Sequence, residues 1–312
     1  MSVTAFFFHI AWVLILLGAW VTYLSSDRGY AHIRQGETVS FYTSVEDSVK
    51  RPLPFPIKLV LFDIEYHPGS DEPADYISFL KIGEEMVRVS MNKIYKGKGY
   101  RIYQYSYDSD EMGTILLVNH DPWGTGITYF AYLLLALTMF ILLFQRIGWK
   151  GLVSTAVPVA LLWVYISRIN PMTPILRTPM LAAHVSVIML SYVLLLTILI
   201  LSVIGLASTR KREKMYRWNT LLLYPAVFLL AAGIFIGAVW ANISWGRYWG
   251  WDAKETWALI TLLVYSFPFH RGSLSFFRDH RKFHLFCIFA FLSILMTFFG
   301  VSFLLGGIHS YL

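Results

Sequence analysis

Long uncharged runs separated by short polar segments dominate the chain. A helix needs about 20 apolar residues to cross a bilayer, and seven runs approach or exceed this length: 4–24, 126–144, 152–167, 181–206, 220–240, 256–270 and 285–305. The first run has neither a basic leading segment nor a small-residue cleavage site, so we expect a retained helix rather than a signal peptide. The pattern predicts a polytopic α-helical membrane protein with about seven transmembrane helices.

Residues 25–124 follow a different pattern. Polar and apolar positions alternate at 57–66 and 100–105, which is typical of half-buried β-strands. Gly97 and Gly99 indicate a turn between strands. We therefore expect a small β-rich domain outside the membrane between the first two helices. The predicted organisation is a helix at 1–24, the β-rich domain at 25–124, a helix and cytoplasmic loop at 125–151, and a helical membrane domain at 152–312.

Composition and charge support a membrane protein and set its orientation. Only 14% of the residues are charged, against roughly 25% in ordinary globular chains, and 56% are hydrophobic. This composition excludes nucleic-acid binding as the explanation of the net charge of +7. Eleven lysines and arginines lie in the connections 145–151, 207–219 and 271–284, against four in the short loops on the opposite side. The positive-inside rule predicts a cytoplasmic N-terminus and an external C-terminus.

The chain contains one cysteine, Cys287, inside an apolar run. An internal disulfide, a C-x-x-C redox pair and a C-x-x-C-H attachment site are therefore excluded. Cys287 is best explained as a small buried apolar residue.

Four histidines fall near the predicted membrane surfaces. His9 and His270 lie toward the cytoplasmic side, and His184 and His309 toward the outer side. A hydrogen-bonded structural role would explain any one of them alone, because ionisable groups in spans face the bundle interior and have partners. Pairing by depth favours a second role, since two imidazoles from separate helices can clamp one haem iron. We assign no chemistry to the other five histidines, and we expect His280 and His284 in a basic cytoplasmic loop.

Five of the eleven tryptophans lie within residues 240–257, which we predict to form an external loop. An aromatic belt at the membrane surface is one explanation. The loop also offers glycines for close approach, basic residues for anionic groups and carboxylates for indole N–H donors. A large planar ligand with an anionic edge, such as a porphyrin with its propionates, fits this set better. The candidate ligand-binding residues are Trp245, Gly246, Arg247, Trp249, Gly250, Trp251, Asp252, Lys254 and Glu255.

The string W-G-R-Y-W-G-W-D-A-K-E-T-W-A-L-I resembles the tryptophan-rich WWD signature of haem-handling membrane proteins. Within these proteins it is similar to the CcsA (ResC) type of System II cytochrome c synthase. The stretches A-H-V-S-V-I-M-L-S-Y around His184 and G-G-I-H-S-Y around His309 agree with this resemblance. The front of the chain resembles a truncated CcsB (ResB), on F-F-F-H-I-A-W-V-L-I-L-L-G-A-W around His9 and on residues 89–108.

The resemblance implies cytochrome c maturation in the bacterial cytoplasmic membrane. It implies that the chain is a holocytochrome c synthase of the lyase type, which exports haem b and attaches it to the CxxCH motif of apocytochrome c. It implies that His184 and His309 ligate haem iron externally, and that His9 and His270 ligate it within the membrane. No residue is assigned as a general acid or base. The implied partners are apocytochrome c, a thioredoxin-like thiol reductant, membrane lipid and a further CcsB/ResB-like subunit.

Two alternatives stay open. The chain is a haem transporter or chaperone whose partner subunit carries out the attachment, or it is a di-haem b-type electron-transfer protein. The second alternative is weaker, because in such proteins one helix commonly supplies ligands to both haems. Here no predicted span carries two of the four histidines.

Overall fold

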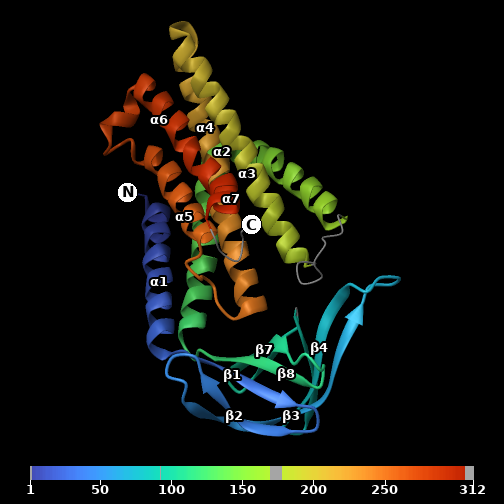
Figure 1. Ribbon diagram of the computed structural model, residues 1–312. Coiled ribbons are helices and arrows are strands. Elements are labelled where there is room, and N and C mark those ends of the chain that lie inside the picture. Colours follow the sequence, from blue (N-terminus) through green and yellow to red (C-terminus); the bar gives the residue numbers. More distant parts are fainter. Residues whose placement is uncertain (1, 92, 169–177, 306–312) are drawn as a thin grey trace. The chain divides into compact units, whose positions relative to one another are not determined.

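The structure is a computed structural model that describes residues 2–91, 93–168 and 178–305 (Figure 1). His309, one of the four candidate ligands, lies outside the described residues. The internal contacts divide the chain into two compact units. The first contains the described residues up to 135 together with Thr178 and 239–248, and the second contains 136–168, 179–238 and 249–305.

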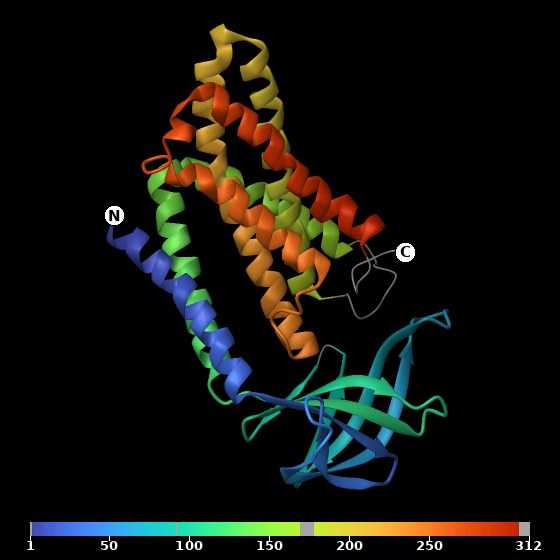
Figure 2. The same cartoon turned by 60° about the vertical axis from the view of Figure 1, so that its left-hand side comes forward.

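The first unit begins with helix α1 (Val3–Ser25), which lies beside the first turns of helix α2 (Gly124–Arg168) (Figures 1 and 2). Gly18 permits this approach, because a Cβ there would lie 2.4 Å from Thr128 Oγ1. Thr22 donates a hydrogen bond to Asp121 at 2.9 Å, where the chain enters α2. The predicted helix at 4–24 is confirmed as a helix long and apolar enough to cross a membrane.

An eight-stranded antiparallel sheet lies between α1 and α2 in the sequence, which confirms the predicted β-rich region. Its order is β5-β4-β3-β2-β1-β8-β7-β6. Lys98 and Gly99, both with positive φ, form the predicted turn between the last two strands of that order. The strands are β1 (Asp27–Arg34), β2 (Thr38–Ser44), β3 (Lys50–Tyr66), β4 (Pro73–Ile82), β5 (Glu85–Ser90), β6 (Tyr95–Gly97), β7 (Tyr100–Tyr107) and β8 (Gly113–His120).

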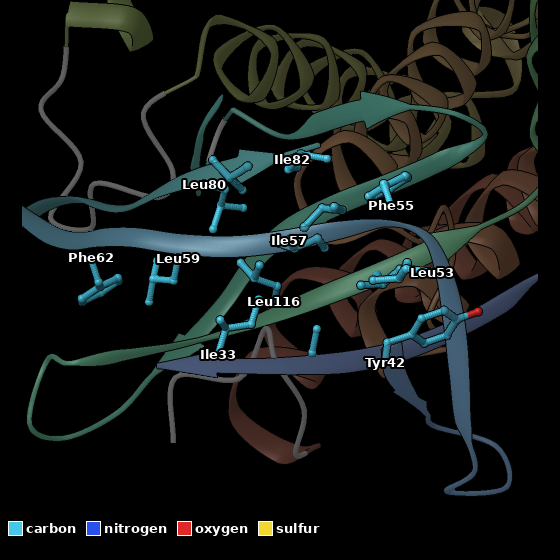
Figure 3. Close-up of a cluster of buried hydrophobic side chains, with 14 residues drawn as sticks. Ile33, Tyr42, Leu53, Phe55, Ile57, Leu59, Phe62, Leu80, Ile82 and Leu116 are labelled. Carbon is cyan, nitrogen blue, oxygen red and sulfur yellow. The ribbon is translucent and has the colours of Figure 1, made fainter. Parts of the chain in front are cut away.

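The sheet curls into an incomplete barrel. Strand β5, at one end of the sheet, contacts β6 and β7 at the other end. Alternate residues point into a shared apolar core that includes Ile33, Ile57 and Leu116, all with no exposed surface (Figure 3). The intervening residues of β1, β7 and β8 face outward, which leaves that face available for other contacts.

The second unit is helical. It contains the later part of α2, helix α3 (Pro179–Ala207) and most of helix α4 (Thr209–Trp245). The remaining elements are α5 (Ala253–Ser266), η2 (Phe267–His270), η3 (Ser275–Arg278), α6 (His280–Leu295), η4 (Met296–Gly300) and α7 (Val301–Leu304).

Five helical segments among the described residues are long and apolar enough to span a membrane: α1, α2, α3, α4 and the continuous run 280–304. The predicted count of seven is therefore not confirmed. The predicted spans 126–144 and 152–167 both fall in α2, which is broken at Gly148 by a left-handed φ of 63°. The predicted span 256–270 corresponds to α5, a helix of only 14 residues, followed by η2.

The expected position of His280 and His284 in a loop is wrong. Both residues belong to the first turns of α6, and His284 has no exposed surface. Its Nδ1 lies 3.3 Å from Ser202 Oγ, and its Nε2 donates to the carbonyl oxygen of Arg212 at 3.2 Å. The helix extends into the basic segment because Asp279 caps it, accepting hydrogen bonds from the N–H groups of Arg281 and Lys282.

Candidate functional site

The tryptophan-rich segment is more helical than expected. Helix α4 continues to Trp245 and α5 begins at Ala253, so only 246–252 of the predicted loop 240–257 is non-helical. Gly246 ends α4 with a φ of +74°, and its N–H donates to the carbonyl oxygen of Asn242 at 3.2 Å. Asp252 begins α5 as its N-cap, accepting a hydrogen bond from Glu255 N–H at 2.7 Å. Local helix capping therefore sets both ends of the non-helical connection 246–252.

The first part of this segment belongs to the first unit. Trp240 and Trp245 contact each other edge to face, with ring centroids 4.9 Å apart. The Trp240 indole N–H is buried and has no hydrogen-bond partner among the described residues. Buried polar groups are rarely left unsatisfied, so this donor fits a site that takes a ligand with an acceptor group.

The second part belongs to the second unit. Glu255 Oε2 accepts a hydrogen bond from the Gly250 N–H at 2.6 Å, which fixes the turn before α5. Trp249 and Trp251 contact edge to face at 5.9 Å. Trp251 is 72% exposed and has a φ of +56°, a strained conformation for a residue other than glycine. Such strain concentrates at functional sites, and here it presents a broad indole face outward.

The β-rich region holds the first part of the tryptophan-rich segment through hydrogen bonds. Asn119 Nδ2 donates to the carbonyl oxygen of Gly246 at 2.7 Å, and Tyr103 donates from its hydroxyl to the carbonyl oxygen of Asn242 at 3.2 Å. Arg101 donates to Asn242 Oδ1 at 2.8 Å. Burial raises the pKa of the Tyr103 hydroxyl, so it stays a neutral donor at physiological pH.

Sequence reasoning did not single out Arg101, Tyr103, Asn119 or Asn242. The alternation at 100–105 places Arg101 and Tyr103 on one face of a strand, but nothing local links this face to a residue about 140 positions away. Gly246 lies close to the β-rich region, because a Cβ there would lie 3.1 Å from the Tyr103 ring. The predicted close approach of its backbone to a planar ligand stays a prediction.

His184 lies in the first turns of α3, in the second unit. Its Nδ1–H donates to the carbonyl oxygen of Gly233 on α4 at 2.7 Å. Gly237, one turn further along α4, makes room for the ring, because a Cβ there would lie 2.7 Å from it. With the proton on Nδ1, the lone pair is on Nε2. This is the tautomer of a histidine that ligates a metal through Nε2.

His9 and His270 show the same hydrogen-bond pattern, each within its own unit. His9 Nδ1–H donates to the carbonyl oxygen of Ala5 at 2.6 Å, and His270 Nδ1–H donates to that of Ser266 at 3.2 Å. In His32 and His284 the proton is on Nε2, which donates to the Asp108 carboxylate in His32 and to the carbonyl oxygen of Arg212 in His284. The three described candidate ligands thus share a tautomer that these two histidines lack.

The two basic candidates in the tryptophan-rich segment are separated by the boundary between the units. Arg247 is exposed and belongs to the first unit, whereas Lys254 lies in the first turn of α5 and is partly buried. Among the described residues, no group of three or more His, Cys, Asp or Glu side chains forms a metal site.

Two families match the chain. The profile of the family described as Cytochrome C assembly protein matches residues 117–309, and that of the ResB-like family matches residues 2–146. The chain thus combines a ResB-like region with a CcsA-like region, as the resemblance predicted.

Curated proteins show the same similarity over parts of the chain. Protein NrfI of Wolinella succinogenes is 35% identical over 162 residues, covering 47% of this chain and 18% of that protein. The cytochrome c biogenesis protein CcsA of Guillardia theta is 34% identical over 171 residues, covering 45% of this chain and 56% of that protein. CcsA of Gloeobacter violaceus is 43% identical over 83 residues, 27% of this chain and 24% of that protein. The match covers less than two thirds of each relative.

Proposed function

Because this chain belongs to the cytochrome c assembly protein family, we propose that it exports haem b across the bacterial cytoplasmic membrane and positions it for attachment to apocytochrome c. The family supports a role in cytochrome c maturation; the export route, the attachment and the residues are our proposal. In this proposal the chain is a holocytochrome c synthase, alone or with a further ResB-like subunit.

The hydrogen bonds of the histidines carry the proposal. His9, His184 and His270 each donate Nδ1–H to a backbone carbonyl oxygen, which places the lone pair on Nε2. In metal sites such a bond orients the ring and raises its basicity. We infer that His9 and His270 bind haem iron near the cytoplasmic surface, and that His184 and His309 bind it near the outer surface.

The orientation follows from the basic connections. We propose that the segments around Lys150, Arg212 and Arg281 are cytoplasmic, and that the β-rich region and the tryptophan-rich segment are external. The first turns of α3, with His184, then lie toward the outer side. Haem moves outward from one histidine pair to the other.

The tryptophan-rich segment provides a surface for the porphyrin. The exposed indole of Trp251 offers a planar apolar face, and Arg247 and Lys254 offer positive charge to the propionates. Gly246 and Gly250 allow close approach of the backbone, and Trp245, Trp249, Asp252 and Glu255 shape the turn around them.

The attachment is an addition reaction. Each thiol of the CxxCH motif adds across one vinyl group: a C–S bond forms, the S–H bond breaks, and the hydrogen passes to the other vinyl carbon. No net oxidation occurs, so the protein contributes orientation and exclusion of competing reactions. Cys287, the single cysteine, is fully buried, so this chain has no dithiol that could reduce a disulfide of the CxxCH motif. A thioredoxin-like partner must therefore supply the thiols of this motif in reduced form.

Co-expression with a CxxCH apocytochrome in a host without its own maturation system tests the proposal. We expect a covalent haem band after denaturing electrophoresis, and we expect its loss in the His184→Ala, His309→Ala double variant. If the wild type gives no band but carries a b-type haem spectrum after purification, the chain is a haem transporter or chaperone without synthase activity of its own. A di-haem electron-transfer protein would retain two stable haems and give no covalent product.

A further inference from the structure

The outer face of the β-rich region carries an open groove that the proposed haem sites do not use. It has a volume of about 620 Å³ and lies over β1, β2, β7 and β8, within the size range of ligand pockets, roughly 300–1,000 Å³. The groove lies wholly within the first unit. Its walls are formed by Tyr30, His32, Phe41, Thr43, Tyr105 and Ile115.

The groove exposes aromatic side chains to solvent. Tyr105 is 56% exposed and Phe41 is 39% exposed. The Tyr30 and Tyr105 rings lie 4.7 Å apart, centroid to centroid, and form one wall. Aromatic side chains with polar tips are typical of surfaces that bind polypeptides, because they combine apolar area with hydrogen-bonding groups at low entropic cost.

Unpaired positive charge borders this aromatic surface. Lys50 Nζ lies 4.5 Å from the centroid of the Phe41 ring. A hydrogen bond with Tyr105 raises the pKa of Tyr30, as does burial, and the positive charges of nearby Arg28 and Arg247 oppose this rise. None of Arg28, Lys50 and Arg247 forms an ion pair with another described residue.

The positive border is not a consequence of composition. Residues 25–124 hold 15 acidic and 11 basic residues, so unpaired cations beside an aromatic groove are a local feature. They complement an occupant that carries carboxylates next to an aromatic or apolar side chain.

A haem is a poor occupant of this groove. His32 Nε2, the nitrogen that ligates haem iron in most haem proteins, is hydrogen-bonded to the Asp108 carboxylate at 2.9 Å. Asp108 is itself held by Arg34 at 3.1 Å, so the imidazole is fixed away from ligation through Nε2. The tautomer shared by His9, His184 and His270 is absent here.

The charge and the aromatic surface together select the occupant. Lys50 lies against the Phe41 ring, and Arg28 lies two residues before Tyr30 on β1. A polypeptide segment that carries carboxylates beside an aromatic side chain complements both features. The polypeptide substrate of the proposed function is the occupant that can offer such a segment.

We propose that this groove is the docking surface for an acidic, aromatic-bearing segment of the apocytochrome polypeptide outside its CxxCH motif. The identity of the partner rests on the proposed function; the chemistry of the segment rests on the groove. Docking there raises the local concentration of the thiols near the attachment site.

The test uses the full chain in lipid nanodiscs and a fluorescent synthetic peptide with a CxxCH motif followed by Asp-Trp-Asp. A second peptide carries Lys-Trp-Lys in place of the flank. We expect the acidic peptide to bind more tightly, and we expect Tyr105→Ala or the double variant Arg28→Glu, Lys50→Glu to weaken its binding about tenfold or more. The matched controls are Tyr66→Ala and Lys58→Glu, exposed residues of β3 outside the groove.

The reversed-charge variant provides the decisive comparison. It should bind the basic peptide more tightly than the wild type does, which misfolding cannot produce. Equal binding of both peptides, or no effect of the groove variants, overturns the proposal. Displacement of the acidic peptide by haemin, lost in Tyr105→Ala, would also overturn it and identify the groove as a haem site. Covalent haem attachment is scored separately, so loss of attachment with peptide binding intact contradicts the proposed function and leaves the acidic-segment site standing.

Discussion

The side-chain amide of Asn119 donates a hydrogen bond to the carbonyl oxygen of Gly246 at 2.7 Å, across 127 positions of sequence. This bond joins the last β-strand to the residue that ends α4. Asn119 is only 6% exposed, so its amide is shielded from water. The last β-strand thus directly holds the start of the tryptophan-rich connection.

Removing this hydrogen bond should lower both the stability of the first unit and the proposed haem-attachment activity. Asn119→Ala leaves the Gly246 carbonyl oxygen without its donor, at a cost of about 1–3 kcal/mol in the free energy of unfolding. We expect a lower thermal midpoint, a shifted tryptophan emission and a reduced yield of covalent haem. Lys58→Ala, at an exposed position of the same sheet, is the control. An unchanged emission and yield in Asn119→Ala would contradict a role in positioning the segment.

Gly246→Ala should lower the free energy of unfolding by more than the cost of its positive φ alone. The φ of +74° costs a residue with a side chain roughly 1 kcal/mol, and the added Cβ would lie 3.1 Å from Tyr103. Two controls separate these effects in thermal unfolding. Gly69 has a φ of +77° with open space around it, and Gly126 has open space and no positive φ. The prediction fails if Gly246→Ala destabilises no more than Gly69→Ala.

Gly237→Ala should impair haem binding without removing a ligand. The new Cβ would lie 2.7 Å from the His184 ring, so the ring must move away from the Gly233 carbonyl oxygen that orients it. We expect a weaker b-type haem spectrum in the purified protein, similar in direction to that of His184→Ala. Gly272→Ala, where the Cβ meets nothing within 4 Å, should keep the wild-type spectrum. Retention of the full spectrum in Gly237→Ala would argue against His184 as an oriented ligand.

His284→Ala should destabilise the helical unit and leave the haem ligands in place. The side chain is fully buried, and its removal leaves a cavity beside Ser202 and Arg212. We expect a loss of about 2–4 kcal/mol in the free energy of unfolding, measured by thermal denaturation in detergent. In the protein that remains folded, the haem spectrum should match the wild type. A selective loss of haem from a stable variant would show that His284 is itself part of the haem site.

The single cysteine offers a test of orientation. Cys287 is fully buried, and burial in the apolar interior makes it a poor target for a charged maleimide. In a Cys287→Ser background, Ser70→Cys in the β-rich region should react from outside intact cells. Gly272→Cys, in the basic segment before α6, should react only after the cells are opened. The reverse pattern would invert the proposed topology.

The sequence by itself determined much of the architecture. Long apolar runs and the alternation in 57–66 and 100–105 depend on neighbours a few positions apart, so they correctly predicted membrane helices and a β-rich region. The tryptophan cluster and the positions of His9, His184 and His270 can also be read directly from the sequence. Their family resemblance is confirmed by the matching profiles.

Only the tertiary structure decided how these parts are held. Helix caps at Gly246 and Asp252 limit the non-helical part of the predicted loop to 246–252. A cap at Asp279 begins α6 early enough that His284 lies in this helix, where it is buried. The bond from Asn119 to Gly246 joins residues that no local period relates. Hydrophobic pattern sets which face of an element is buried, but hydrogen-bond partners depend on which distant elements meet, and that is determined only when the chain packs.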